Sequence, residues 1–157
     1  MLHAADVDAM RAIGAALARA LESITAPFVI ALEGELGAGK TTLVGAFLNG
    51  LGFTGHARSP TYTLIEPYEL AGRAVYNLDL YRLTDPREVD ALGLRDLQEP
   101  RSIFLIEWPE RGRGALPAAD LTISVRYAET DGRSLRITPG SNSGRDALLA
   151  FSAAAKP

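Results

Sequence analysis

The chain has 157 residues, of which 47% are hydrophobic and 22% charged, and its formal net charge is −3. This length predicts a single domain, residues 1–157, whose core needs no covalent staples. The chain contains no cysteine, which excludes disulfides and thiolate metal sites, and its small net charge excludes a bulk attraction to nucleic acid or an anionic membrane. Four glycines interrupt the uncharged stretch 41–57, and charges interrupt the N-terminal stretch. We therefore expect no membrane span, no secretory signal and a cytoplasmic location.

The first third of the chain predicts a helix, a buried strand and a second helix. Apolar positions recur at helical spacing over 6–23, with Asp6 or Asp8 as the N-cap. The continuous apolar run 28–32 is typical of a strand that is buried on both faces. Helical spacing returns over 40–50, where glycines end the helix.

The rest of the chain predicts strands mixed with helices. Two β-rich runs, 62–70 and 73–81, are joined by a short Ala-Gly turn and indicate a hairpin or two adjacent strands. A helix is expected from Asp85-Pro86 to Gly93. The remaining predicted elements are three strands and a weak C-terminal helix, at 103–106, 121–127, 134–138 and 143–154. Because two of the strands are apolar throughout, we expect a central sheet covered on both faces.

Residues 34–41, GELGAGKT, match the phosphate-loop pattern G-x-x-x-x-G-K-[ST] between a predicted strand and a predicted helix. Its glycines permit positive φ, so the N–H groups of 36–41 are expected to form a cup around a β-phosphate. Lys40 is expected to bridge the β- and γ-phosphates, and the Thr41 hydroxyl to bind Mg²⁺. Only two of the sixteen basic residues are lysines, which indicates that Lys40 is required for its chemistry. The fold class predicted is α/β, a P-loop NTPase-like three-layer sandwich with a mixed central sheet.

A P-loop also needs a carboxylate at the end of a neighbouring strand. Glu107 follows four apolar residues, the layout of a Walker B strand, and is favoured for the metal, either directly or through water. Asp79 follows a less apolar run and is favoured for ordering the attacking water or for supporting the metal ligands. The alternative for each acid is a solvated strand end.

Three further features each allow two interpretations. The hydroxyl-rich segment 59–63 lies where many P-loop proteins sense the γ-phosphate, but such a turn needs no ligand. Trp108 could pack against a nucleotide or fill the core. The segment 111–114 could touch nucleic acid or a partner, or form a solvated loop.

His3 and His56 are isolated and lack metal-ligand spacing, and no N-K-x-D run supports guanine specificity.

Five stretches in this order, GELGAGKTTL, SPTYTL, NLDLYRL, GLRD and IEWPER, resemble the TsaE (YjeE) family of small bacterial P-loop ATPases. The similarity runs over about 6–137, and the combination is far more specific than the P-loop alone. The resemblance implies an ATP-binding and ATP-hydrolysing, Mg²⁺-dependent subunit of the machinery that makes N6-threonylcarbamoyladenosine (t6A) in tRNA. Such a subunit associates with the TsaB–TsaD pair and allows its turnover, with tRNA as an indirect substrate. Because no arginine finger can be identified in the chain, hydrolysis alone is expected to be slow.

The resemblance also assigns residues by position. Lys40, Asp79 and Glu107 are expected in catalysis, and Thr41 and Glu107 at the metal. The nucleotide-binding residues expected in the loop and outside it are Gly37, Ala38, Gly39, Lys40, Thr41, Thr42, Asp6, Trp108 and Arg133. One position departs from the family pattern, because Asn77 stands where close relatives often have His, and no role is implied for it.

Two other functions stay open from the residues alone. A small P-loop kinase would need an acceptor site and a lid, for which Arg111 and Arg113 are a thin candidate. It would transfer phosphate to a metabolite in preference to water. A nucleotide-dependent binding module would keep its partner function after Asp79→Ala.

Overall fold

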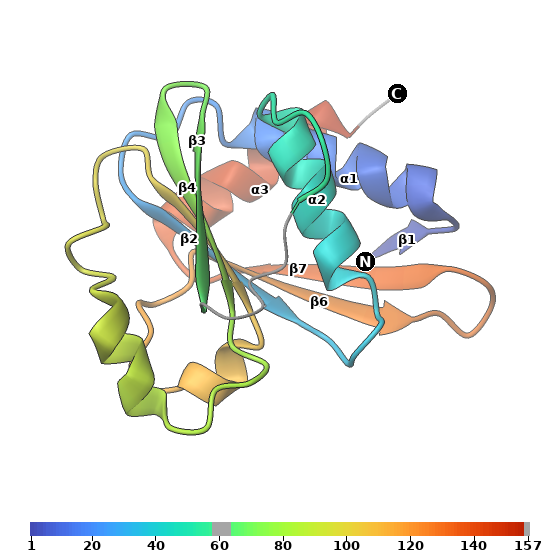
Figure 1. Ribbon diagram of the computed structural model, residues 1–157. Coiled ribbons are helices and arrows are strands. Elements are labelled where there is room, and N and C mark those ends of the chain that lie inside the picture. The colour runs from blue at the N-terminus through green and yellow to red at the C-terminus, as the bar shows by residue number, and fades with distance from the viewer. Residues whose placement is uncertain (58–63, 156–157) are drawn as a thin grey trace.

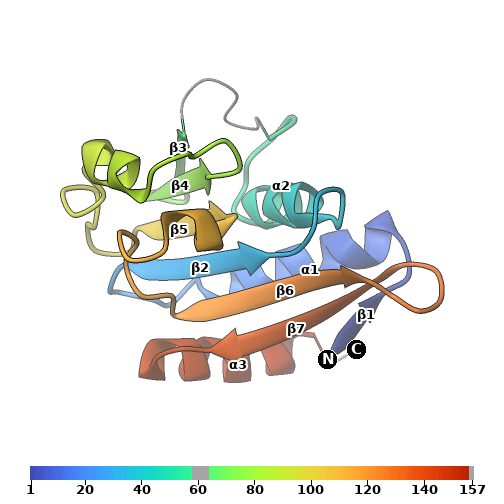
Figure 2. The same ribbon diagram turned by 90° about the horizontal axis from the view of Figure 1, so that it is seen from below.

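The structure is a computed structural model that describes residues 1–57 and 64–155. Its centre is a seven-stranded mixed sheet in the order β1-β7-β6-β2-β5-β4-β3, with the strands side by side in Figure 2. The four strands β4, β5, β2 and β6 are parallel, and β1, β7 and β3 pair antiparallel with their neighbours. The strands span Leu2–Ala4 (β1), Phe28–Glu33 (β2), Ile65–Leu70 (β3), Arg73–Asp79 (β4), Ile103–Glu107 (β5), Leu121–Tyr127 (β6) and Arg133–Pro139 (β7).

Three α-helices cover one face of this sheet (Figure 1). They are α1 (Val7–Ala20), α2 (Lys40–Gly50) and α3 (Asn142–Ala154). Because side chains alternate along a strand, Phe28, Ile30 and Leu32 of β2 pack with these helices, whereas Val29 packs on the opposite face. The uninterrupted apolar run is therefore explained by a strand that is buried on both sides, as predicted.

Helix α2, which begins at the phosphate loop, is held tightly against α1. A Cβ atom added at Gly14 of α1 would lie 2.4 Å from the Cβ of Ala46, and one added at Gly50 of α2 would lie 2.7 Å from the Cβ of Ala18. Since no larger side chain fits between them, the two helices are in close van der Waals contact. Small residues at this contact thus fix the position of α2 against α1. The spacing of apolar residues along the sequence does not distinguish these positions from the rest of an amphipathic helix face.

The opposite face is covered by two 3-10 helices and their loops, η1 (Pro86–Leu92) and η2 (Pro109–Gly112). Buried Val89 of η1 belongs to the same apolar cluster as Leu78, Phe104 and Ile106 from the sheet. The expectation of a sheet covered on both faces is confirmed. The outer layer on this side, however, contains 3-10 helices where the sequence predicts one ordinary helix.

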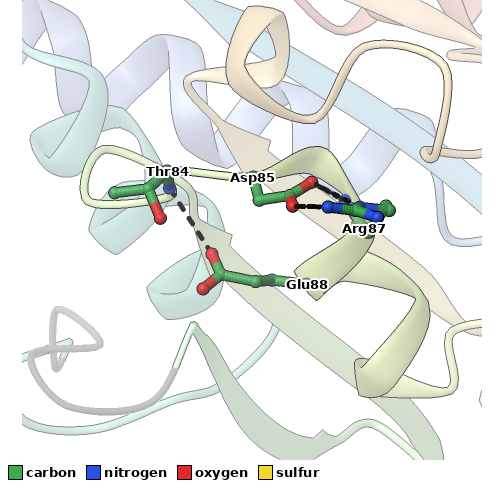
Figure 3. A network of polar contacts seen from close by, with 4 residues as sticks. All are labelled: Thr84, Asp85, Arg87 and Glu88. Carbon is green, nitrogen blue, oxygen red and sulfur yellow. Dashed lines mark hydrogen bonds and ion pairs between the residues drawn. The ribbon is translucent and has the colours of Figure 1, made fainter.

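The start of η1 is organised by a local polar network (Figure 3). Asp85 accepts a hydrogen bond of 2.9 Å from the Arg87 N–H and forms an ion pair of 2.7 Å with the Arg87 guanidinium. The Thr84 N–H faces the carboxylate of Glu88 at 3.4 Å. At the other end, Gly93 has φ 65° and its N–H donates to the Asp90 carbonyl, three residues back. The predicted start and end of this helix are confirmed. A hydrogen bond from an N–H to the carbonyl three residues earlier is typical of a 3-10 helix.

Strand β1 is the sheet element that the sequence did not predict. Its three residues pair with β7, where Leu2 lies opposite Leu135 and Ala4 opposite Arg133. Three residues are too few to show an alternation of apolar and polar side chains, so the formation of this strand depends on its pairing with β7.

Within the described ranges, no helix has both the length and the apolar character that crossing a bilayer requires.

The parallel strands direct the candidate site to one edge of the sheet. Strands β2, β5 and β4 end at Glu33, Glu107 and Asp79, and the register places Leu32 and Asp79 on either side of Glu107. In open α/β sheets ligands bind outside these carboxyl ends. The loop of 34–39 leaves β2 at the same edge and enters α2.

Candidate functional site

The phosphate loop has the backbone conformation that its glycines were expected to permit. Gly37 has φ 79°, and Gly39, the N-cap of α2, has φ 111°. L-residues with side chains adopt such values only with strain, so these positions require glycine. One detail differs from the prediction that all N–H groups of 36–41 face into a common cup, because the Ala38 N–H donates to the Glu35 carbonyl at 3.1 Å.

Lys40 is buried with its ammonium group inside the loop. Its Nζ donates to the carbonyls of Gly34 and Glu35 and lies 4.1 Å from the centre of the Trp108 ring. Burial lowers the pKa of the Lys40 ammonium, and nearby carboxylates, led by Glu107, oppose that shift. The ammonium group therefore lies within the loop, and its bridging of the β- and γ-phosphates stays a prediction.

Thr41 and Glu107 meet although they are 66 positions apart in the chain. The Thr41 hydroxyl, in the first turn of α2, donates to Oε1 of Glu107 at 3.1 Å. Glu107 is only 2% exposed, so the interpretation of a solvated strand end is wrong for this acid. Among the described residues, Oε2 of Glu107 and Oδ1 of Asn77 are buried without a hydrogen-bond partner.

These orphaned oxygens bear on whether a metal fits. A buried acceptor without a donor is costly, and a divalent cation is a partner that satisfies oxygen ligands directly. No cluster of three His, Cys, Asp or Glu side chains suited to a metal occurs in the part of the chain that the structure describes. Mg²⁺ needs no such cluster, since it usually binds through one or two protein oxygens plus substrate phosphates and waters. The donor set at Thr41 and Glu107 therefore fits Mg²⁺.

Burial raises the pKa of the Glu107 carboxyl from its ordinary value of 4.5 to about 7, and the charge of Asp79 acts in the same direction. The hydrogen bond from Thr41, the nearby Asn77 amide and the charge of Lys40 oppose this increase in the pKa. Burial thus disfavours ionised Glu107 even beside Lys40, and a further positive group at this place would favour its ionised form.

This carboxyl should make the metal-free protein less stable as pH rises from about 4.5 to 7. Below that window the group is protonated in both states, whereas within it the unfolded chain releases the proton first. A difference of about 2.5 pH units corresponds to a cost of about 3 kcal/mol above pH 7. Urea unfolding in EDTA should show that Glu107→Gln, which cannot ionise, removes about 2–3 kcal/mol of the stability difference between pH 5 and pH 8. An unchanged difference would contradict the assignment.

Asp79 lies beside Glu107 at the carboxyl end of the sheet. The two residues are register partners on the parallel strands β4 and β5. The half-buried Asp79 accepts a hydrogen bond of 3.0 Å from the Tyr81 N–H, which orients its carboxylate at the start of the following turn. The structure therefore brings both predicted acids to the edge where the loop of 34–39 begins.

Trp108 packs in the core on one side, as one of its two interpretations has it, and its packing against a nucleotide stays a prediction. Its ring packs against the apolar cluster on the 3-10 side, and one face lies against the ammonium of Lys40. The ring of Tyr81 lies 5.0 Å from it, and the Arg111 guanidinium lies 5.1 Å from Tyr81 and 5.7 Å from Trp108. Of this aromatic pair, the sequence analysis selected Trp108 and did not select Tyr81, which lies two residues after Asp79.

The side chain of Arg133 contacts the backbone of the phosphate loop. Its Nε donates to the Ala38 carbonyl at 2.8 Å. Tyr127, which the sequence analysis did not select, donates its hydroxyl proton to the Gly37 carbonyl at 3.1 Å.

Asp6 caps α1 by accepting from the Ala9 N–H at 2.8 Å, which resolves the choice of N-cap in its favour.

The other expected residues divide between the site and its surroundings. Thr42 follows Thr41 on α2 and is exposed. The segment 59–63, for which both a γ-phosphate sensor and a turn without a ligand were possible, lies outside the described residues.

A family model described as "Threonylcarbamoyl adenosine biosynthesis protein TsaE" matches residues 4–135. The chain belongs to the TsaE family. Its curated relatives include the tRNA threonylcarbamoyladenosine biosynthesis protein TsaE of Haemophilus influenzae, 46% identical over 79% of this chain and 78% of that protein. The TsaE of Bacillus subtilis is 36% identical over 79% of this chain and 80% of its own length.

A solved structure supports the same conclusion. The crystal structure of Bacillus subtilis YdiB superposes with a TM-score of 0.77 and 28% identity, covering 97% of this chain and 93% of that one. The α/β fold with a mixed sheet that the sequence predicts is therefore shared with a solved protein. As a TsaE family member, the chain takes part in tRNA threonylcarbamoyladenosine biosynthesis.

Proposed function

We propose that this chain is the Mg²⁺-dependent ATPase subunit of the t6A machinery and that it acts on the TsaB–TsaD complex to allow its turnover. The observation that carries the proposal is the contact between Thr41 at the start of the P-loop helix and buried Glu107, whose second oxygen has no partner among the described residues. A hydroxyl and a carboxylate at this place are the protein ligands that a nucleotide-bound Mg²⁺ requires. The proposal treats residues 1–157 as one ATPase domain.

The chain's own residues divide the work as follows. The backbone from Gly37 to Thr42 binds the phosphates, and the Lys40 ammonium leaves its loop carbonyls to bridge the β- and γ-phosphate oxygens. Thr41 and Glu107 would hold Mg²⁺, and the ion would supply positive charge that neutralises the phosphates. Cleavage transfers the γ-phosphoryl group to water and leaves ADP.

Asp79 is placed to orient the attacking water. Its carboxylate is fixed by the Tyr81 N–H and lies on the strand next to Glu107, on the side away from β2. A positioned carboxylate of this kind accepts a proton or a hydrogen bond from the nucleophile. Trp108, Asp6 and Arg133 are proposed to lie near the bound nucleotide, with Trp108 supported by its contact with Lys40.

The partners follow from the family. Relatives described as tRNA threonylcarbamoyladenosine biosynthesis proteins support a role in that machinery. Within it we propose TsaB and TsaD homologues as partners and tRNA as the substrate of the complex. The proposed location is the cytoplasm, where tRNA is modified.

The experiment that tests this function is ATP hydrolysis by the purified chain, alone and with TsaB–TsaD, with inorganic phosphate and ADP as the products measured. We expect slow turnover alone, an increase of about tenfold or more with the complex, and no turnover in EDTA, because partners often complete the catalytic charge of P-loop enzymes. Co-purification of TsaB and TsaD with the tagged chain in ATP provides a second measurement. A rate that the complex leaves unchanged, or phosphate found on a metabolite instead of in solution, would refute the proposal.

A further inference from the structure

The end of the β6–β7 hairpin lies against the outside of the phosphate loop. Tyr127, the last residue of β6, and Arg133, the first of β7, are register partners. The connection between them is closed by a hydrogen bond from the Ala128 N–H to the Gly132 carbonyl. The Arg133 guanidinium lies 4.1 Å from the centre of the Tyr127 ring, so the two side chains form a preassembled stacked pair.

This pair binds two consecutive carbonyls of the loop. Tyr127 donates to the Gly37 carbonyl at 3.1 Å, and Arg133 donates through Nε to the Ala38 carbonyl at 2.8 Å. The Nη2 atom of Arg133 also lies 3.5 Å from the Gly37 oxygen. Both donors come from the sheet, 90 and 95 positions along the chain from the carbonyls that they bind.

Holding these carbonyls also orients the N–H groups of the loop. In a trans peptide the C=O and the following N–H point in opposite directions. The Ala38 carbonyl is directed to Arg133, so the Gly39 N–H is directed away from the hairpin. That N–H belongs to the N-cap of α2, where a phosphate is expected.

The loop needs such an external support. Gly37 and Gly39 have no side chains with which to anchor their positive-φ conformations, and glycine loses the most conformational entropy when it is ordered. Strand β6 supports the beginning of the loop as well, since a Cβ atom added at Gly34 would lie 2.4 Å from the Val125 carbonyl. Strand β6 and the hairpin end thus support the loop from Gly34 to Ala38.

We propose that Tyr127 and Arg133 are positioning residues of the nucleotide site, which hold the phosphate loop in its binding conformation through the Gly37 and Ala38 carbonyls. The inference rests on the proposed function, because it takes the loop as the phosphate site. It assigns Arg133 an effect through the loop backbone, and it adds Tyr127 to the residues on which phosphate binding depends.

Two conservative variants test this inference. Tyr127→Phe removes the hydroxyl and keeps the ring under Arg133, while Arg133→Lys keeps the positive charge and removes the Nε donor. Arg136→Lys, an exposed change on the same strand, is the matched control. We expect ATP affinity to fall about 3- to 10-fold in the first variant and about 10-fold in the second, with the control unchanged and the melting temperature similar in all.

Inorganic tripolyphosphate separates positioning from a direct contact with the nucleoside. Positioning requires the affinity for tripolyphosphate to fall by the same factor as that for ATP. A loss confined to ATP would mean that the pair contacts the base or the ribose, and would overturn the inference. A loss matched by a lower melting temperature would show a general structural role and would overturn it too.

Amide hydrogen exchange in the nucleotide-free protein keeps this inference separate from the function on which it rests. Faster exchange over 36–41 in both variants, but not in Arg136→Lys, is the expected result. Exchange that stays at the wild-type rate in both variants would overturn the positioning role. If the wild-type chain bound neither ATP nor tripolyphosphate, the proposed function would fail, and the exchange measurement would still decide whether the pair orders the loop.

Discussion

Lys40→Ala is expected to lower the affinity for ATP about 100-fold or more. The variant removes the cation that the loop holds against the Gly34 and Glu35 carbonyls and the Trp108 ring. Charge-assisted hydrogen bonds contribute about 1.5–3 kcal/mol each, so the loss of two to a triphosphate amounts to a hundredfold or more. Isothermal titration of ATP with Mg²⁺ measures the effect.

The matched control for Lys40→Ala is Arg113→Ala, which removes an exposed positive charge beyond η2. It should leave the titration within about twofold of the wild type, because exposed charges interact weakly through water. A melting temperature close to that of the wild type would show that the Lys40 variant is folded. An ATP titration curve that does not change in that variant would refute the site.

Glu107→Ala is expected to raise the Mg²⁺ concentration needed for half-maximal ATP hydrolysis by about 10- to 100-fold. It removes the carboxylate that Thr41 contacts and that carries the orphaned buried oxygen. Asp79→Ala should lower the rate by about 100-fold or more and change the Mg²⁺ requirement only a few-fold, since its proposed work is on the nucleophile. Mg²⁺ titrations of both variants at saturating ATP measure the difference.

Glu110→Ala is the matched control for these two acids. Its carboxylate influences Lys40 electrostatically, but the residue is exposed and lies after the strand that carries Glu107. We expect a Mg²⁺ requirement close to that of the wild type. If Asp79→Ala raised the requirement more than Glu107→Ala did, the roles assigned to the two acids would have to be exchanged.

Local chemistry explains why so much of the fold was predictable. The strand before the loop and the helix after it are specified by apolar run length, by helical spacing and by glycines. The sequence also identified Asp79 and Glu107 as acids at strand ends, and the parallel pairing of β4 with β5 in the structure places them side by side. The family was recognisable for the same reason, since its motifs are contiguous stretches.

Burial and long-range register could not be predicted in this way. Spacing did not distinguish a buried acid from a solvated one, and the position of β5 between β2 and β4 decided that Glu107 is the buried acid. The orphaned oxygen of Asn77 depends on the same enclosure. Strand β1 and the 3-10 character of η1 likewise depend on contacts that no short window of sequence contains.

The amino-acid sequence by itself determined the phosphate-loop motif, the two acids at strand ends and the α/β class, because each depends on residues a few positions apart or on where a strand ends. Only the tertiary structure decided which donors hold the loop carbonyls. Tyr127 and Arg133 reach Gly37 and Ala38 because the antiparallel β6–β7 hairpin, which lies on the side of β2 opposite β5, ends beside the loop. Strand pairing and burial set that proximity, and neither is visible in the spacing of residues along the chain.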